Sequence, residues 1–358
     1  MAWLVLKDGK GFEGEKFGSW PAEDKEVYGE VVFNTSMTGY QEMITDLSYA
    51  GQILTFTQPQ IGNYGWHNEE SEASKNLLKG LVVRELAAGE GSFHADRTLE
   101  SYCLKQSIPG LKGIDTRELT RHIRKNGTLP GVMVSQLEEG IGYWQNHGST
   151  AIRPDRHWVY QTTVSEEYVI PGNGPILAVL DFGAKRNILR CLQSRGFKLH
   201  VFPAGTSADE IMDINPVGLV LSNGPGDPSG LPEIAENVSN LISKIPILGI
   251  CMGHQIMAIS SGAQTYKLPF GHRGGNHPVQ NRETLKVTMT SQNHGYAVDE
   301  SSLKGTGFKV LYSNLNDGTV EGMKHENFHV LTVQYHPEAA PGPEENEEIF
   351  DQFVEMLK

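Results

Sequence analysis

Two hydrophobic patterns divide the chain, and the division falls near a run of prolines and glycines. Up to about residue 140, short apolar runs such as residues 3–6 are bounded by polar or glycine residues, which predicts a β-rich domain. Residues 171–175, Pro-Gly-Asn-Gly-Pro, fit neither a helix nor a central strand. We therefore expect a first domain over residues 1–140, a linker over 141–175 and a second domain over 176–358.

The first domain has few helical signals. Asp8 and Gly9 separate two short strand candidates and predict a hairpin. Further strands are expected at residues 31–34 and 52–57. A helix is predicted to begin after Asp115, which has glutamate three residues later, and to end at Gly127. This pattern is typical of an α+β domain that is rich in strands.

The second domain alternates continuous apolar runs with amphipathic segments. Strands are predicted at residues 176–180, 218–221, 245–250, 285–289 and 330–334, and helices at 185–195, 234–243 and 344–357. Continuous apolar strands that alternate with helices are typical of a sheet covered on both faces. The fold we expect is a β-rich α+β domain followed by an open, mostly parallel α/β sheet.

Composition excludes several classes of function. The 358-residue chain has a formal net charge of −13 at pH 7; its surface repels phosphate backbones and anionic lipid, so we expect no nucleic-acid or membrane partner. No run approaches the ~18 apolar residues that span a bilayer, and no signal-peptide pattern opens the sequence. Three cysteines give neither a disulfide framework nor zinc-ligand spacing. We expect a reduced, cytoplasmic enzyme.

One of the three cysteines lies in a turn suited to nucleophilic chemistry. Residues 249–253, Gly-Ile-Cys-Met-Gly, join a predicted strand to a helix expected from His254. The glycines permit the strained turn of a nucleophile elbow, which we expect to project Cys251 into solvent above the sheet edge. The N-terminus of a helix also favours a thiolate. Cys103 and Cys191 lack this context, and we interpret them as small buried hydrophobic residues.

A thiolate nucleophile needs a base, and one of the thirteen histidines is well placed for that role. His336, Pro337 and Glu338 follow a predicted strand, and side chains two positions apart on an extended segment share a face. We expect Glu338 to hold the Nδ1–H of His336 while Nε2 faces Cys251. Both Cys251 and His336 follow strands, where open α/β sheets place their sites. Ligand spacing for a metal is absent nearby, so we expect none.

Two polar segments accompany these residues. The segment 223–228, Asn-Gly-Pro-Gly-Asp-Pro, exposes backbone N–H groups that suit an oxyanion hole, but taken alone it favours a sharp turn. It lacks the pattern of a phosphate-binding loop. The segment 291–296, Ser-Gln-Asn-His-Gly-Tyr, is expected to be a loop that ends a strand. It offers donors to an α-amino acid, and a plain hairpin turn is the alternative.

Taken together in their order along the chain, the segment 223–228, the elbow, the segment 291–296 and the His336–Glu338 pair resemble the triad glutamine amidotransferases. Further motifs resemble the carbamoyl phosphate synthetase small-subunit family, chiefly its N-terminal domain. These motifs are FNTSMTGYQE at 33–42, IGNYG at 61–65, GIDTR at 113–117 and GHRGGNHP at 271–278. The resemblance runs from about residue 3 to 357. Other amidotransferases share the triad but lack the first domain.

The resemblance implies roles for matching residues. Cys251 would attack the side-chain amide of glutamine to form a γ-glutamyl thioester, His336 would shuttle the proton and Glu338 would orient it. The backbone N–H groups of Gly224 and Met252 would form the oxyanion hole. The other positions that match glutamine-holding residues of the family are Ser48, Gly226, Gln255, Asn293, Gly295 and Tyr296. Two positions depart from the family: Leu47 replaces a usual proline, and Met252 replaces a common leucine.

The family also implies a division of labour. L-glutamine would be hydrolysed on this chain without a cofactor, and ammonia would pass to a separate large subunit. That subunit would use ATP, magnesium and bicarbonate to make carbamoyl phosphate, and the first domain would dock against it. Two alternatives are a cysteine hydrolase or peptidase with the same elbow, and a non-catalytic binding module. The first domain and the complete set of Cys251, His336 and Glu338 count against them.

Overall fold

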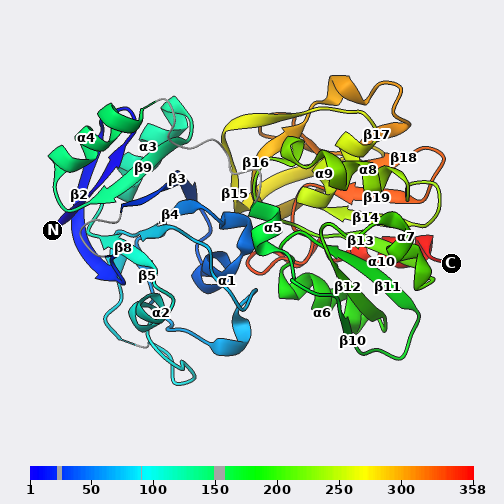
Figure 1. Ribbon diagram of the computed structural model, residues 1–358, viewed down its shortest axis with the longest axis horizontal. Helices are drawn as coiled ribbons and strands as arrows, with labels where there is room; N and C mark the ends of the chain where they lie inside the picture. Colours follow the sequence, from blue (N-terminus) through cyan, green and yellow to red (C-terminus); the bar gives the residue numbers. More distant parts are fainter. Residues whose placement is uncertain (22–25, 90, 149–157) are drawn as a thin grey trace. The chain divides into compact units, whose positions relative to one another are not determined.

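The chain divides into two compact units, Met1–Asp155 and Arg156–Lys358. The computed structural model describes residues 1–21, 26–89, 91–148 and 158–358 (Figure 1). The division lies inside the predicted linker, and residues 158–175 belong to the second unit. This part of the predicted linker contains a short helix and a strand. The strand pairs with the sheet of the second unit.

A small closed barrel forms the core of the first unit. Its strands, in order around the barrel, are β1 (Ala2–Leu6), β2 (Gly11–Gly18), β8 (Pro109–Lys112), β6 (Gly80–Val82), β4 (Gln52–Phe56), β3 (Val27–Asn34) and β9 (Leu129–Val134). Outside it lie α1 (Tyr40–Thr45), α2 (Leu99–Lys105), α3 (Thr116–Asn126), α4 (Leu137–His147) and the short pair β5 (Gln60–Ile61) and β7 (Glu85–Leu86).

Local signals in the first unit produce the elements expected from them. The predicted hairpin joins β1 to β2, and Gly9 at its tip has φ +88°, which favours glycine. The Asp115 side chain accepts a hydrogen bond of 2.9 Å from the Glu118 backbone N–H and begins α3. Gly127 ends that helix at φ +85°. The predictions of this hairpin and this helix are confirmed.

An open sheet forms the core of the second unit (Figure 1). Its strands, from one edge to the other, are β10 (Tyr168–Ile170), β12 (Lys198–Pro203), β11 (Ile176–Asp181), β13 (Gly218–Leu221), β14 (Ile247–Ile250), β19 (Val330–Val333), β18 (Val320–His325), β17 (Phe308–Asn314), β15 (Thr265–Asn281) and β16 (Val287–Val298). Its helices are α5 (Trp158–Thr162), α6 (Arg186–Ser194), α7 (Ala208–Asp213), α8 (Pro232–Ser239), α9 (Met252–Ser260) and α10 (Glu348–Met356).

The prediction of a mostly parallel sheet holds only for its centre. Strands β12, β11, β13, β14 and β19 pair in parallel, whereas β18, β17, β15 and β16 are antiparallel, as is β10 at the other edge. Short turns suffice between antiparallel strands, so this part of the sheet needs no crossover helices. The sheet is therefore mixed, with its parallel strands in the middle.

Apolar side chains cover both faces of the parallel strands. On one face, residues such as Leu180 and Leu221 pack with Ile234 of α8 and Ile256 of α9. On the other face, the neighbouring strand residues pack with α6 and with Phe350 of α10. This two-sided burial explains the continuous apolar runs in the sequence. Among the described residues, no helix combines the length and apolar character needed to cross a membrane.

Candidate active site

Cys251 occupies a strained turn between β14 and α9. Its backbone has φ 52° and ψ −101°, and its N–H donates to Val333 O at 2.8 Å. A Cβ at Gly249 would lie 2.8 Å from Gly253 O, and one at Gly253 would collide with Leu221 O, so both positions need glycine. The elbow is present, but α9 begins at Met252, two residues earlier than predicted.

The elbow directs the Cys251 side chain into the protein instead of into solvent. The residue is only 2% exposed, so the prediction of a solvent-facing thiol is wrong. Its Sγ lies 3.7 Å from Asn293 O on β16, because that strand runs past the turn. Cys103 and Cys191 are buried as expected, and burial raises the pKa of each thiol to about 12.

His336 and Glu338 form a buried pair. His336 Nδ1 donates to Glu338 Oε1 over 2.7 Å, and the two residues are 2% and 0% exposed. Burial lowers the pKa of His336, but the Glu338 carboxylate and Cys251 outweigh it and raise that pKa to about 10. Within the part of the chain that the structure describes, the other ring nitrogen, Nε2, is buried without a hydrogen-bond partner of ordinary geometry, and the Cys251 thiol interacts with the ring. The Glu338 carboxylate therefore favours the protonated form of the ring.

Lys185 completes this charge arrangement, and the sequence analysis missed it. Its Nζ lies 2.9 Å from Glu338 Oε1, and the two side chains are 3% and 0% exposed. The same ammonium donates to Ala339 O. Burial raises the pKa of Glu338, but Lys185 and His336 outweigh it and lower that pKa to about 2. The available signal was position, because Lys185 closely follows β11 at the same sheet edge as Cys251 and His336.

The segment 223–228 is tied to the elbow and to Lys185. Ser222 O accepts from Gly253 N–H at 3.0 Å, and the Asn223 side chain accepts from Lys185 N–H at 3.0 Å. A Cβ at Gly224 would lie 2.6 Å from Phe182 O, and Gly226 has φ +95°. The backbone geometry at Gly224 and Gly226 needs glycine, and the role of the segment as an oxyanion hole stays a prediction.

Other predicted glutamine-holding residues of the second unit lie near the elbow. Residues 291–296 are part of β16, so the expectation of a loop there is wrong; their pairing with β15 carries the strand through them. Gln255, one turn along α9 from the thiol, donates to Tyr296 O at 2.9 Å. Ser48 lies in the first unit, in the 3-10 turn Leu47–Tyr49, and its N–H donates to Asp46 Oδ1 at 2.9 Å. Its role stays a prediction.

Three possible metal ligands also meet in the second unit. Atoms of His272, His294 and Glu321 lie within 4.8 Å of one another, and all three residues are buried. Each is already engaged: His272 pairs with Asp317 at 2.8 Å, His294 contacts the Gln292 amide at 2.7 Å, and Glu321 accepts from the same amide at 2.8 Å. The arrangement is that of a satisfied hydrogen-bond network beside β16.

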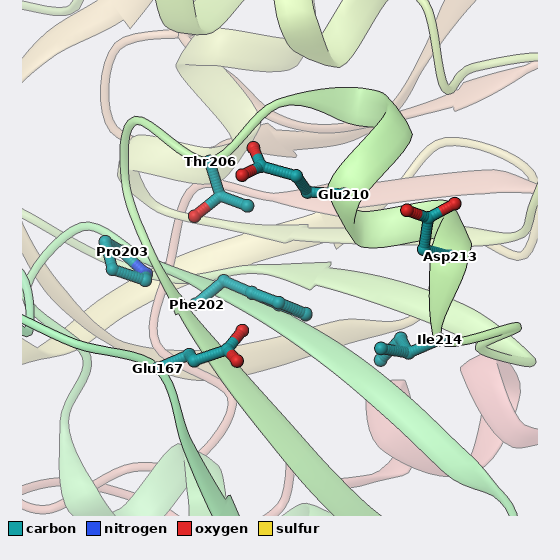
Figure 2. A pocket seen from close by; sticks show the side chains of 7 residues that line it. All are labelled: Glu167, Phe202, Pro203, Thr206, Glu210, Asp213 and Ile214. Atoms are coloured by element: carbon teal, nitrogen blue, oxygen red, sulfur yellow. The ribbon is translucent and has the colours of Figure 1, made fainter.

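A surface pocket of the second unit lies at the end of β12 and against α7 (Figure 2). Its volume is about 390 Å³. It is lined by Glu167, Phe202, Pro203, Thr206, Glu210, Asp213 and Ile214. None of these is a predicted site residue. Glu210 closes a capping box with Ser207, and Glu167 pairs with His200 at 3.2 Å, so two of its carboxylates already have partners.

Two different protein families match the two parts of the chain. Residues 178–356 match the family described as glutamine amidotransferase class-I, and residues 4–133 match the carbamoyl-phosphate synthase small chain, CPSase domain. The chain is 46% identical to the carbamoyl phosphate synthase small chain of Listeria monocytogenes, with 99% of this chain and 96% of that one covered. It is 45% identical to the Bacillus subtilis pyrimidine-specific small chain, covering 99% and 95%.

Replacing the carboxylate partner should lower the pKa of His336. In Glu338→Gln the carboxylate that favours the imidazolium is lost, so we expect that pKa to fall from about 10 by more than one unit. Histidine ring carbon shifts in a pH titration of labelled protein measure it. The carboxylate of Glu167 contacts His200 at the surface, so Glu167→Gln serves as a control that leaves His336 unchanged. An unaltered His336 titration in Glu338→Gln would contradict the arrangement.

Removing the buried ammonium should destabilise the protein through Glu338. Lys185→Met leaves that carboxylate with one cation fewer, and breaking a buried pair costs about 3–5 kcal/mol. The stability that Glu338 contributes is present above its unfolded pKa of about 4.3 and is lost as pH falls toward about 2. Chemical denaturation should therefore show a large loss at pH 7 and a smaller difference from wild type near pH 3. Exposed Lys304→Met is the matched control, and equal losses in both variants would contradict the assignment.

Proposed function

The chain belongs to the carbamoyl-phosphate synthase small-chain family, and we propose that Cys251, His336 and Glu338 are the residues with which it hydrolyses glutamine. The chain is the glutamine-hydrolysing small subunit of that enzyme, a ligase system. The observation that carries the residue assignment is the Cys251 elbow next to a buried His336–Glu338 pair. A peptidase or a non-catalytic module does not account for the match of both units.

The proposed reaction begins with an ion pair. In this mechanism the proton of Cys251 passes to Nε2 of His336, whose protonated form Glu338 favours, and Cys251 attacks as a thiolate. Sulfur attacks the carboxamide carbon of glutamine, and the resulting oxyanion accepts hydrogen bonds from the N–H groups of Gly224 and Met252. His336 Nε2 then protonates the leaving nitrogen, the C–N bond breaks, and ammonia leaves a γ-glutamyl thioester.

Hydrolysis of the thioester restores the starting state. The ring, now neutral at Nε2, takes a proton from water, and the hydroxide formed attacks the thioester carbon. The C–S bond breaks, glutamate leaves, and the imidazolium faces a thiolate again. Glu338 fixes the ring throughout by accepting from Nδ1. The ammonium of Lys185 keeps Glu338 ionised in its buried position.

Six further positions complete the proposed glutamine site. They are Ser48, Gly226, Gln255, Asn293, Gly295 and Tyr296. Support for five of them comes from the second unit, where β16, the start of α9 and the segment after β13 meet around the elbow. Ser48, in the 3-10 turn Leu47–Tyr49 of the first unit, is assigned on the family resemblance alone.

The synthesis itself belongs to the partner. A small chain implies a large-subunit partner, with glutamine as the substrate of the small chain. We propose that the large subunit holds the ATP and magnesium and combines ammonia with bicarbonate, that the first domain docks against it, and that the pair works in the cytoplasm. The family match over residues 4–133 supports the docking role, because that stretch contributes no member of the proposed triad.

Loss of the thiol should separate the two halves of the reaction. In a complex with the large subunit, Cys251→Ser should abolish glutamine-dependent carbamoyl phosphate synthesis. The serine hydroxyl stays protonated at neutral pH and cannot replace the thiolate as a nucleophile. Synthesis from added ammonium chloride should continue near the wild-type rate. Cys191→Ser is the matched control and should keep both activities. Glutamine-dependent synthesis by the Cys251→Ser complex would refute the nucleophile assignment.

Docking should protect the first domain from solvent. We expect hydrogen–deuterium exchange of the full chain to slow on addition of the large subunit, chiefly in peptides from residues 1–140. Backbone amides exchange slowly when an interface covers them or restrains their opening. The chain without partner supplies the baseline. Protection confined to residues 176–358 would contradict the docking role of the first domain.

A further inference from the structure

Gln334 is a buried polar residue to which the proposed mechanism gives no task. It follows β19, two positions before His336, and is 0% exposed. Its backbone N–H donates to Glu321 O at 2.9 Å. Its side-chain Oε1 accepts from Gln255 Nε2 at 2.9 Å, whereas its own Nε2 is buried with no hydrogen-bond partner in the described part of the chain. Burying an amide nitrogen without a hydrogen-bond partner costs free energy, so the position of Gln334 calls for an explanation.

The contacts of Gln255 fix which way its amide faces. Tyr296 O is a backbone carbonyl and can only accept, so the Gln255 atom 2.9 Å from it is the nitrogen. The second hydrogen of that nitrogen is donated to Gln334 Oε1. Both donors of Gln255 are therefore bound within the protein. The oxygen, Oε1, is the one polar atom of its side chain left for a ligand.

We propose that Gln334 is a positioning residue that makes Gln255 a pure hydrogen-bond acceptor toward the substrate, and thereby selects the α-ammonium group of L-glutamine. The inference rests on the proposed place of Gln255 in the glutamine site. Held at both hydrogens, the amide cannot turn its nitrogen toward the ligand. A ligand must then offer a donor to Oε1, and the α-ammonium is the donor that distinguishes an amino acid from a plain carboxamide acid.

The orientation of Gln255 depends on the acceptor oxygen of Gln334, so variants can be chosen that remove this oxygen or keep it. Gln334→Met has a side chain of similar length without an oxygen, and Gln334→Asn keeps the amide but is one methylene too short to reach. In either, Gln255 is held at one hydrogen only and can rotate about its contact with Tyr296 O. Gln334→Glu keeps an oxygen at the same distance; burial keeps the carboxyl protonated, and its carbonyl oxygen can still accept from Gln255, so the contact should be preserved.

The experiment measures glutaminase kinetics of the complex with L-glutamine and with glutaramate, which lacks the α-ammonium. In Gln334→Met and Gln334→Asn we expect KM for L-glutamine to rise roughly tenfold, the effect of one lost hydrogen bond. We expect kcat to change by less than about twofold, because the reacting atoms are untouched. In these two variants the preference for L-glutamine over glutaramate in kcat/KM should fall by the same factor. Gln334→Glu should keep the wild-type preference.

Two controls separate this inference from a general loss of packing and from the proposed site itself. Leu331→Ala disturbs the same strand without touching Gln255, and should lower the melting temperature but keep the substrate preference. Gln255→Leu should raise KM for L-glutamine if Gln255 binds substrate at all. No effect in Gln255→Leu refutes the proposed site. An effect there, together with an unchanged preference in both Gln334→Met and Gln334→Asn, overturns the role of Gln334 alone.

Discussion

Three buried charges fix the geometry of this site. Lys185, Glu338 and His336 are all at most 3% exposed, and a charge so far from water is tolerated only when it is paired. Glu338 lies 2.7 Å from the imidazole and 2.9 Å from the ammonium, so it satisfies both cations at once. In the proposed mechanism the Cys251 thiolate supplies the second negative charge, and the set is neutral. Moving any one of these groups would leave another charge without its partner in a medium of low dielectric constant.

The parallel centre of the sheet is what brings these groups together. Cys251 follows β14, Glu338 follows β19 and Lys185 follows β11, and these strands run in the same direction. Residues far apart in the sequence therefore leave the sheet at one edge. The two glycines of the elbow add a local requirement, since a side chain at Gly253 would collide with the backbone of β13. Sheet topology and the steric limits of the turn therefore both determine where the Cys251 side chain lies.

A second level of order surrounds the reacting groups. Gln255, Tyr296 and Gln334 form a chain of hydrogen bonds that fixes the direction of one amide, and Asn223 ties the segment after β13 to Lys185. Such contacts place donors and acceptors before substrate arrives, which is the condition for selective binding and for electrostatic stabilisation of an intermediate. The site is therefore held by hydrogen bonds between several segments that are distant in the sequence.

The sequence by itself determined the local features and the candidate reactive residues. The hairpin at Gly9, the helix begun by Asp115, the elbow and the His336–Glu338 pairing all depend on neighbours in the chain, so short patterns of residues suffice to predict them. Family resemblance added the predicted glutamine-holding positions, which spacing alone does not reveal.

Only the tertiary structure decided the contacts between distant segments. It showed that Lys185 neutralises Glu338, that Cys251 is buried, that residues 291–296 are a strand, and that half of the second sheet is antiparallel. Each depends on which strands lie side by side, and pairing across tens or hundreds of residues leaves no periodic trace in the sequence. Local features depend on residues that are neighbours in the sequence, whereas burial and charge pairing arise only when the sheet is assembled.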